Sequence, residues 1–454
     1  FIMRVSMLIA IVSMIAVAGW YDSGDSMMYR IGKSIETFAE VFRHINTDYV
    51  DEIDPERVAR IGIDAMLASL DPYSNYMDEV QSDDFDAQIS GRYVGLGITV
   101  ASVDSMLTVT SVAQGYSAWT SGIRVGDRLL SVEGTTVLRI SPKDLRRYTR
   151  GEHGTTARVA VLREGRKDTL WFAIQRSDIA VRSITFAERR SDGIAVIKLE
   201  RFTRRTAQEA QRVMDSLRAM GPLRGIILDL RDNPGGVLDA AVSICEMFTK
   251  TGAMIVSTKG RDESSSTVYT NSSVPYEAEC PMAILINSVS ASASEVVAGC
   301  LQDNDRAVIC GEQSFGKGLV QSQFPTPYGT TLKMTTQRYY CPSGRCIQRR
   351  SYSANGSSDT LVIHPSFYTL NKRPMLDACG ITPDTVMRES DLPTFVKHLV
   401  SRGVIARVAT RYASMYQSLP VTFDPAVLLA DVESEAAREG YDDFPVHAKL
   451  KELT

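Results

Sequence analysis

Hydrophobic and polar positions follow two different periods along the middle of this chain. Apolar residues at strand spacing occupy 193–199, 225–230 and 282–286, and an apolar stripe at helical spacing runs over 206–220. Strands and helices that alternate in this way through residue 340 predict an α/β core with a mainly parallel sheet.

The two ends of the chain have helical patterns instead. Near the N-terminus the pattern predicts a helix from Ser34 to about residue 46 and a second helix that opens at Asp54. Near the C-terminus, apolar spacing predicts helical segments over 392–416 and 425–438. The Ser/Gly-rich stretch at 351–359 that precedes them is expected to be an exposed loop.

Candidate chemistry lies in two short segments 25 residues apart, around Ser292 and Lys317. Ser292 follows the apolar run 282–286 and is therefore expected at a strand-to-helix turn, where helix N-terminal amides can face an anion. None of the five histidines lies inside a motif, so a Ser-His-Asp triad has no evident second member. A desolvated lysine can act as the base in its place once its pKa falls.

Longer motifs around these two residues resemble those of a known family. They are Asp229-Leu-Arg-Asp-Asn-Pro-Gly-Gly236, Asn287-Ser-Val-Ser-Ala-Ser-Ala-Ser-Glu295, Gly311-Glu312, Phe315-Gly-Lys-Gly318 and Thr336-Gln-Arg-Tyr-Tyr-Cys-Pro-Ser-Gly-Arg345. Together they resemble the carboxy-terminal processing proteases, or tail-specific proteases, of peptidase family S41. The resemblance runs from about residue 36 to about residue 384.

The resemblance implies roles for three side chains. Ser292 would be the nucleophile, Lys317 the general base, and Gln321 the residue that orients the lysine. The family usually has glycine where this chain has Val289, and this change bears on the loop that carries Ser292. The family also implies a crotonase-like α/β protease core.

Two glycines and one helix amide are candidates for an oxyanion hole. Gly235 and Gly236 let the backbone approach a substrate closely, and the Ala293 N–H would be the second donor. Which of the two glycines donates stays open at this point. Asp229 and Asp232 flank the same turn, and we interpret them as residues that shape the loop.

A separate segment resembles a PDZ domain. It contains the loop Gly95-Leu96-Gly97-Ile98, the later stretch 121–134, a short predicted helix at 144–148 and a predicted strand at 155–162. In the PDZ fold, the backbone N–H groups of such a loop bind the terminal carboxylate of a peptide that pairs as an added strand. The resemblance therefore implies protein or peptide substrates with apolar C-terminal tails, and a domain that can gate the cleft.

The segments combine into five expected parts. These are a signal peptide or membrane anchor at 1–20, an N-terminal helical region at 21–84, an inserted, mainly-β PDZ domain at 85–178, an S41 serine protease core at 179–350 and a C-terminal region at 351–454. The resemblance suggests that terminal segments pack on the core or mediate assembly into a homo-oligomer.

Composition excludes some other classes of function. A length of 454 residues, with 44% apolar and 23% charged residues, is typical of a globular protein of several domains. The net charge of −4 gives the chain no broad attraction to nucleic acid. No cofactor is implied, and no metal-ligand spacing is evident. The seven cysteines leave at least one unpaired, and Cys341 and Cys346 are equally consistent with a closed turn or with two free thiols.

The N-terminal pattern predicts export. A charge-free apolar run from Val5 to Gly19 follows Arg4, and Ala16-Val-Ala18 fits a signal-peptidase site. The run is short for a spanning helix, although 1–3 and 20–21 extend it to the length of an uncleaved anchor. We therefore expect a periplasmic protein, or one anchored to the inner membrane and facing the periplasm.

The sequence thus predicts an exported serine endopeptidase that cleaves proteins near their C-termini with a Ser/Lys dyad. The competing class is a catalytically inactive PDZ scaffold or peptide-binding protein, for which Val289 is the sequence argument. A serine amidase that acts on small molecules is a third class, but it would not need a carboxylate-binding domain. Retention of Ser292, Lys317 and Gln321 favours the protease.

Overall fold

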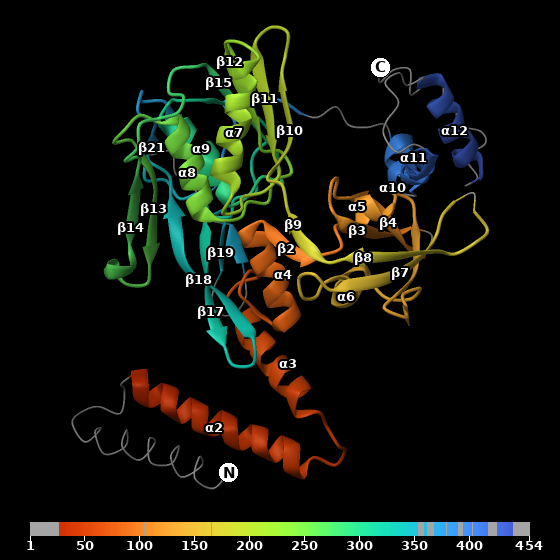
Figure 1. Ribbon diagram of the computed structural model, residues 1–454. Helices are drawn as coiled ribbons and strands as arrows, with labels where there is room; N and C mark the ends of the chain where they lie inside the picture. Colours follow the sequence, from red (N-terminus) through yellow and green to blue (C-terminus); the bar gives the residue numbers. More distant parts are fainter. Residues whose placement is uncertain are drawn as a thin grey trace.

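The computed structural model describes residues 27–103, 105–164, 166–352, 358–360, 367–377, 379–388, 394–401, 403–415 and 425–438 (Figure 1). The predicted export segment at 1–20 lies outside these residues. In the described part of the chain, no helix has the length and apolar character needed to cross a membrane.

A six-stranded sheet forms the centre of the larger domain. Its strands have the order β10-β11-β12-β15-β16-β23, with β10 antiparallel to β11 and the remaining pairs parallel. Their bounds are β10 Ile184–Arg189, β11 Ile194–Leu199, β12 Gly225–Asp229, β15 Met282–Ile286, β16 Val308–Gly311 and β23 Thr385–Val386. The mainly parallel sheet predicted from the apolar runs is confirmed.

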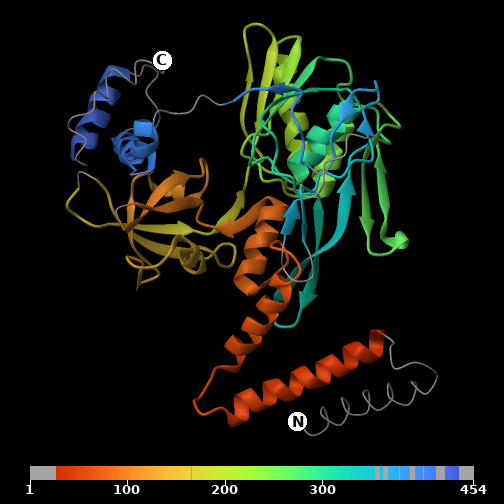
Figure 2. The same cartoon turned by 180° about the vertical axis from the view of Figure 1, so that it is seen from behind.

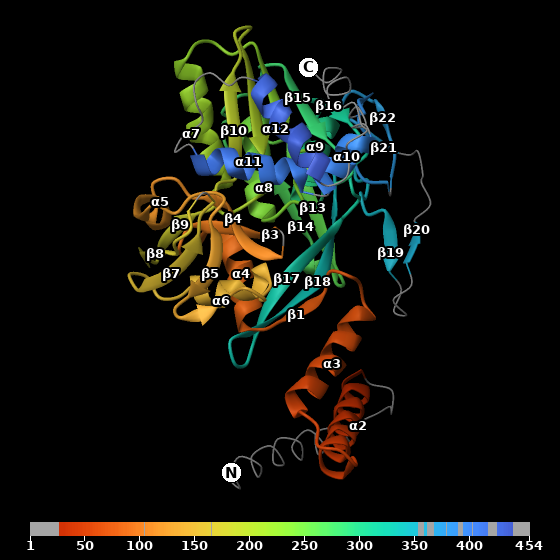
Figure 3. The ribbon, with the colours of Figure 1, turned by 90° about the vertical axis from the view of Figure 1, so that its right-hand side faces the viewer.

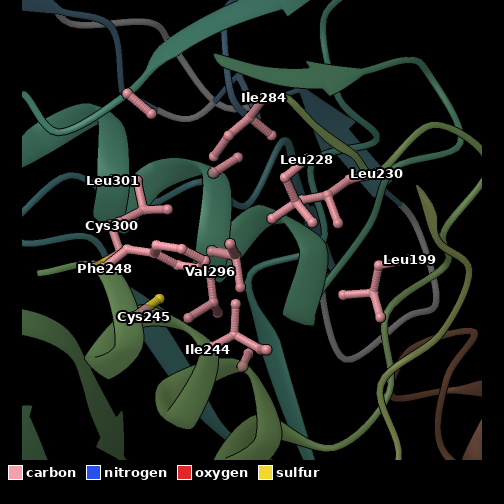
Figure 4. Packing of buried hydrophobic residues seen from close by; sticks show 14 of the residues in the cluster. Leu199, Leu228, Leu230, Ile244, Cys245, Phe248, Ile284, Val296, Cys300 and Leu301 are labelled. Atoms are coloured by element: carbon pink, nitrogen blue, oxygen red, sulfur yellow. The ribbon is translucent and has the colours of Figure 1, made fainter. Parts of the chain in front are cut away.

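Three helices pack on this sheet and bury its apolar side chains. They are α7 Thr206–Ala219, α8 Leu238–Phe248 and α9 Ala293–Asp303. Figure 4 shows Phe248 of α8 and Val296 of α9 among the side chains of the core. All eleven residues of α9 are buried, so this helix is held from every side and fixes whatever lies at its first turn.

A second sheet covers the other side of α8 and α9. It has the order β1-β18-β13-β14, and β17 pairs along β18. The bounds are β1 Asn75–Met77, β13 Met254–Gly260, β14 Thr267–Thr270, β17 Leu319–Thr326 and β18 Thr330–Tyr340, with a 3-10 turn at Glu263–Ser265. The antiparallel β17–β18 hairpin extends well beyond the core (Figure 1).

A smaller domain is inserted before the central sheet. Its sheet has the order β3-β4-β5-β7-β8, with β6 paired to β5. The bounds are β3 Ile98–Val103, β4 Met106–Val112, α5 Ser117–Ser121, β5 Arg128–Val132, β6 Thr135–Thr136, α6 Pro142–Thr149, β7 Thr156–Leu162 and β8 Leu170–Gln175. The strands β2 Arg92–Gly95 and β9 Ser177–Ala180 pair with each other where the chain enters and leaves this domain (Figure 2).

Helices precede the two domains. They are α2 Met27–Asp48, α3 Pro55–Ala68 and α4 Glu79–Ser90, and Asp54 caps α3 as predicted. The predicted start of the first helix at Ser34 is wrong, because α2 begins seven residues earlier and the Ser34 hydroxyl bonds to the Arg30 carbonyl inside the helix. Helix α2 has no buried residue and extends away from both domains (Figure 3).

The C-terminal part contains more regular structure than expected. The stretch predicted to be a loop at 351–359 contributes to the paired strands β19 Arg350–Tyr352 and β20 Ser358–Thr360. Short strands β21 Phe367–Tyr368 and β22 Pro374–Met375 also pair. Where a helical segment was predicted over 392–416, the described residues form two helices, α10 Thr394–Ser401 and α11 Val404–Met415, and Gly403 between them has a left-handed φ of 72°. Helix α12 Pro425–Arg438 has the predicted bounds.

Candidate active site

Ser292 lies at the tight turn between β15 and α9, as predicted. Its φ of +56° falls in the left-handed region, which is uncommon for a residue with a side chain. Two hydrogen bonds hold the preceding loop in place. The Ser290 hydroxyl donates to the Leu230 carbonyl, and the Asn287 side-chain oxygen accepts from the Val289 N–H. The loop therefore closes with valine at position 289, whose side chain is largely exposed.

Glu295, in the first turn of α9, joins the serine turn to the lysine loop. One of its carboxylate oxygens, Oε2, accepts from both the Ser292 N–H and the Lys317 N–H, each at 2.8 Å. The other oxygen accepts from the Gly316 N–H at 2.7 Å and from the Ser314 hydroxyl at 2.5 Å. Because one oxygen binds both backbone groups, the two segments are held within a few ångströms of each other.

Burial opposes the charge on this carboxylate. Glu295 is completely buried, and desolvation raises its pKa, while the Ser314 hydroxyl and the three backbone N–H groups act in the opposite direction. A carboxylate buried without such donors would be very unstable. The four hydrogen bonds therefore offset the free-energy cost of burying the Glu295 carboxylate, and they also fix the geometry around Ser292.

Lys317 is largely removed from water. Its Nζ lies 4.4 Å from the centre of the Tyr73 ring, a cation–π contact. Desolvation, assisted by the nearby Lys333 ammonium, lowers the pKa of Lys317 to about 8, although Glu295 and Asp71 act in the opposite direction. A lysine with this pKa is partly neutral near neutral pH, which is the property that a general base needs.

Gln321 lies on β17, four residues beyond the lysine. Its amide Nε2 donates to Thr335 Oγ1 at 3.3 Å and to the Leu319 carbonyl at 3.5 Å. Within the described residues, no hydrogen bond joins Gln321 to the Lys317 amine or the amine to the Ser292 hydroxyl. The orienting role of Gln321 therefore stays a prediction.

The Gly-Gly turn lies directly against Ser292. A Cβ added to Gly235 would lie 2.8 Å from the Ser292 Cβ and 2.9 Å from the Ala293 nitrogen. The Gly235 N–H already donates to Asn233 Oδ1 at 2.9 Å. By contrast, the N–H groups of Gly236 and Ala293 have no acceptor in the part of the chain that the structure describes. The geometry thus separates the two glycines, which the sequence left equivalent.

Within the described residues, the two aspartates near this turn contact groups other than Ser292. Asp229 forms an ion pair with Arg231 at 2.7 Å, and Asp232 accepts from the Asn287 side-chain amide at 2.8 Å. Both interactions shape the loop, in agreement with the interpretation drawn from the sequence.

Sequence reasoning missed Glu295, Tyr73 and Asn233 as parts of the site. Glu295 had a detectable signal, because a serine followed three residues later by glutamate is typical of a helix start. Tyr73 lies more than 200 residues away from Lys317 along the chain, so no local pattern could associate the two.

The predicted carboxylate-binding loop lies in the smaller domain. Gly95 ends β2, Leu96 is buried, Gly97 has a φ of +81°, and Ile98 begins β3. Strand β3 is at the edge of its sheet, with α6 beside it. An edge strand next to a helix offers an incoming peptide a row of backbone groups to pair with.

All seven cysteines, including Cys341 and Cys346, are free thiols in the structure. Within the described residues, no group of His, Cys, Asp and Glu side chains is arranged so that it could hold a metal ion.

Comparisons with known proteins agree with these observations. Residues 193–355 match the model of peptidase family S41, residues 108–163 match the PDZ domain, and residues 16–80 match the N-terminal domain of the activating protease CtpB.

Individual relatives are similar over most of the chain. The carboxy-terminal-processing protease of Bartonella bacilliformis is 35% identical over 319 residues, which cover 70% of this chain and 73% of that protein. The carboxy-terminal processing protease CtpA of Bacillus subtilis is 29% identical over 83% of this chain and 76% of that protein. The solved photosystem II D1 C-terminal processing protease is 23% identical over 79% of this chain and 94% of that chain, with a TM-score of 0.41.

The match to the family model, over residues 193–355, spans the positions of Ser292, Lys317 and Gln321. The fold is mixed α/β with a PDZ domain, and the chain is a serine-type peptidase. The chain therefore belongs to the carboxy-terminal-processing proteases of peptidase family S41.

Proposed function

We propose that this protease cleaves proteins near their C-termini with a dyad of Ser292 and Lys317. The observation that carries the proposal is the shared Glu295 oxygen, which holds the backbone of the serine and that of a buried lysine together. Neutral Lys317 accepts the proton of the Ser292 hydroxyl as the serine oxygen attacks the scissile carbonyl. The same amine then returns the proton to the leaving amino group, and water hydrolyses the acyl-enzyme.

The amine has to leave Tyr73 for this step. Its contact with the ring is a cation–π interaction, which favours the protonated amine, whereas the reaction needs the neutral one. Catalytic hydrogen bonds in unliganded enzymes are often long and tighten only when substrate binds. Rotation of the flexible lysine side chain from the ring towards Ser292 brings the base into place.

The oxyanion formed in this attack is stabilised by the N–H groups of Gly236 and Ala293. Both groups lack an acceptor among the described residues, and Ala293 is at the first turn of α9, where the helix dipole favours negative charge. Gly235 makes the approach possible, because any side chain there would collide with the serine turn.

The PDZ domain supplies the selection of substrate in this proposal. Gly95, Leu96, Gly97 and Ile98 bind the terminal carboxylate of an apolar tail, and the tail pairs with the edge of β3. Export to the periplasm, either free or anchored to the inner membrane, is part of the proposal and is supported by the N-terminal sequence pattern alone.

Two sets of measurements test the proposal. Ser292→Ala and Lys317→Ala should each reduce turnover of a protein with an apolar tail by several orders of magnitude, and the double variant should be no worse than either single one. A lysine variant with unchanged turnover would contradict the dyad. For recognition, matched peptides with a free or an amidated C-terminus should differ in KM and kcat. Equal KM and kcat values for the two peptides would contradict recognition of the terminal carboxylate.

A further inference from the structure

A hollow of about 440 Å³ lies on the second sheet, beside the site described above. Its floor is formed by β18 where this strand pairs with β13 on one side and with β17 on the other. In this register Arg338 has Lys259 as one neighbour and Leu319 as the other. The hollow is therefore built on regular strands, and only part of its wall comes from the segment 348–352.

Most of the charged residues that line this hollow are basic. Lys259, Arg261, Arg338 and Arg350 line it, and Asp71 is the acidic residue among the lining residues. In the described part of the chain, none of the four basic residues forms an ion pair with a carboxylate. The hollow therefore carries positive charge that the protein does not neutralise.

Asp71 offsets only part of this charge, because it is one carboxylate among four basic residues and its oxygens already accept hydrogen bonds within the protein. It accepts from the Tyr73 N–H and from the Ser74 N–H, both at 2.8 Å, and from the Ser74 hydroxyl at 3.1 Å. Lys259 lies with its Nζ 4.7 Å from the centre of the Tyr340 ring, which leaves its charge available to a ligand.

The hollow is close to the amine of Lys317. Tyr352 lines it and lies edge-on to Tyr73 with ring centres 6.0 Å apart, and Lys317 Nζ lies on the Tyr73 ring. The path from the amine to the wall is thus on the order of 10 Å, which about three residues of extended chain can span. A polypeptide with its scissile bond at Ser292 can place a neighbouring side chain here.

We propose that this hollow is a subsite for an acidic side chain of the substrate, a few residues from the scissile bond. The proposal rests on the proposed function, since it places a bound polypeptide at Ser292. Guanidinium groups bind carboxylates through paired N–H donors, which Arg261, Arg338 and Arg350 offer, while Lys259 adds an ammonium group. The subsite would add a preference for Asp or Glu inside the substrate to the selection made at the tail.

Pairs of peptides test this subsite. Each pair differs only by Glu or Gln at one of the four positions on either side of the cleavage site, and all peptides keep the same free apolar tail. For the wild-type enzyme we expect kcat/KM to be about 5- to 10-fold higher with Glu at one of these positions, and the preference should shrink as salt increases. The double variant Arg338→Gln/Arg350→Gln should lose the preference and cleave the neutral peptide as the wild type does.

A matched variant controls for loss of charge. Arg212→Gln removes an exposed arginine from α7, outside the hollow, and should keep the preference. Equal kcat/KM for Glu and Gln at every position, or a preference that survives in the double variant, would overturn the subsite. Weaker cleavage of the neutral peptide by the double variant would assign the hollow to the terminal carboxylate and would also overturn it.

Failure of the proposed function can be recognised separately. If the wild type cleaves none of the peptides, binding of the same labelled pairs to Ser292→Ala decides about the subsite by fluorescence anisotropy. Tighter binding of the Glu peptide, lost when Arg338 and Arg350 are also replaced, would support the subsite without any cleavage. Equal binding of both peptides would reject it.

Discussion

At the scale of single residues, the carboxylate of Glu295 is the most constrained group of the site. Each of its two oxygens accepts two hydrogen bonds, and both members of the proposed dyad depend on the same oxygen. Glutamine has the same shape but only one accepting oxygen, so it can satisfy only one of the two pairs. The residue thus acts as a positioning group rather than as a reacting one.

Glu295→Gln should therefore lower kcat by about 10²-fold, because displacement of a catalytic group by about 1 Å can have an effect of that size. KM should change much less, since Glu295 is buried and does not face the substrate. Steady-state kinetics and circular dichroism of the purified variant would check this. Glu312→Gln, which removes a less buried carboxylate nearby, should behave like the wild type, and an active, folded Glu295→Gln enzyme would show that the shared oxygen is dispensable.

The pH dependence of the reaction follows from Lys317. Its pKa is lowered to about 8 by burial, so the neutral amine is the minor form at pH 7 and the major form above pH 8. We expect kcat/KM to rise with pH through about 8 and then to level off. A pH–rate profile measures this, and each of the five histidine variants should keep it. A fall in activity across the same range would mean that the protonated lysine is the active form.

The sequence was sufficient to predict the turn that carries Ser292, and the dyad of Ser292 and Lys317 stays a prediction. It did not distinguish Gly235 from Gly236 as an oxyanion donor, because the difference depends on Asn233, whose side-chain oxygen accepts a hydrogen bond from the Gly235 N–H. It also predicted that Gln321 orients the lysine, which stays a prediction, and within the described residues the amine of Lys317 contacts the Tyr73 ring. Contacts between residues far apart in the chain decide these details, and local patterns do not record them.

At the scale of elements, a buried ion pair joins the end of α9 to the turn after β18. Arg345 donates to Asp303 at 2.8 Å, and both side chains are almost completely buried. Arg345 also donates to Gln302 at 2.8 Å. This pair anchors the C-terminal end of the helix whose first turn carries Ser292.

Arg345→Ala should lower the free energy of unfolding of the protease core by about 3–5 kcal/mol, because it leaves the Asp303 carboxylate buried without its partner. Chemical denaturation followed by circular dichroism would measure the change. Lys250→Ala breaks an ion pair in which both partners are largely exposed, and should have little effect. If both variants unfolded at the same denaturant concentration as the wild type, the buried pair would not contribute to stability.

Element boundaries were predicted well where a cap or a breaker was present. Asp54 and the proline after it define the start of α3, and α12 has the predicted bounds. The start of α2 was misplaced because serine favours both helix caps and bonds within a helix, and sequence alone does not separate these uses. The β19–β20 hairpin was missed because its Ser/Gly-rich composition is typical of loops.

At the scale of the whole molecule, ion pairs hold the PDZ domain against the N-terminal helices. The carboxylate of Asp84, on α4, lies 2.5 Å from Arg146 of α6 and 2.5 Å from Arg150 just after it. Asp84 is buried, whereas its neighbour Asp83 is exposed. The helix next to the edge strand of the PDZ domain is thus tied to the protease through one carboxylate.

Asp84→Asn should loosen this connection, since an amide attracts two guanidinium groups much less than a carboxylate does. We expect faster limited proteolysis between the two domains and a larger radius of gyration in small-angle X-ray scattering. Asp83→Asn loses the same charge one residue away and should leave both measurements unchanged. Identical scattering and cleavage for all three proteins would show that other contacts fix the domain.

The two ends of the PDZ domain meet at a single point. Strands β2 and β9 pair, and the Val181 N–H donates to the Gly91 carbonyl at 2.9 Å just outside that pair. One hydrogen bond thus joins the first and last residues of a segment of about 90 residues. The two ends of a domain inserted into a host fold often lie close together in this way. Replacing this domain by one that prefers another substrate tail would require only that the two ends of the new domain lie equally close together. If the PDZ domain selects the substrate as proposed, substrate choice and peptide hydrolysis can evolve separately, through recombination at the junction of β2 and β9.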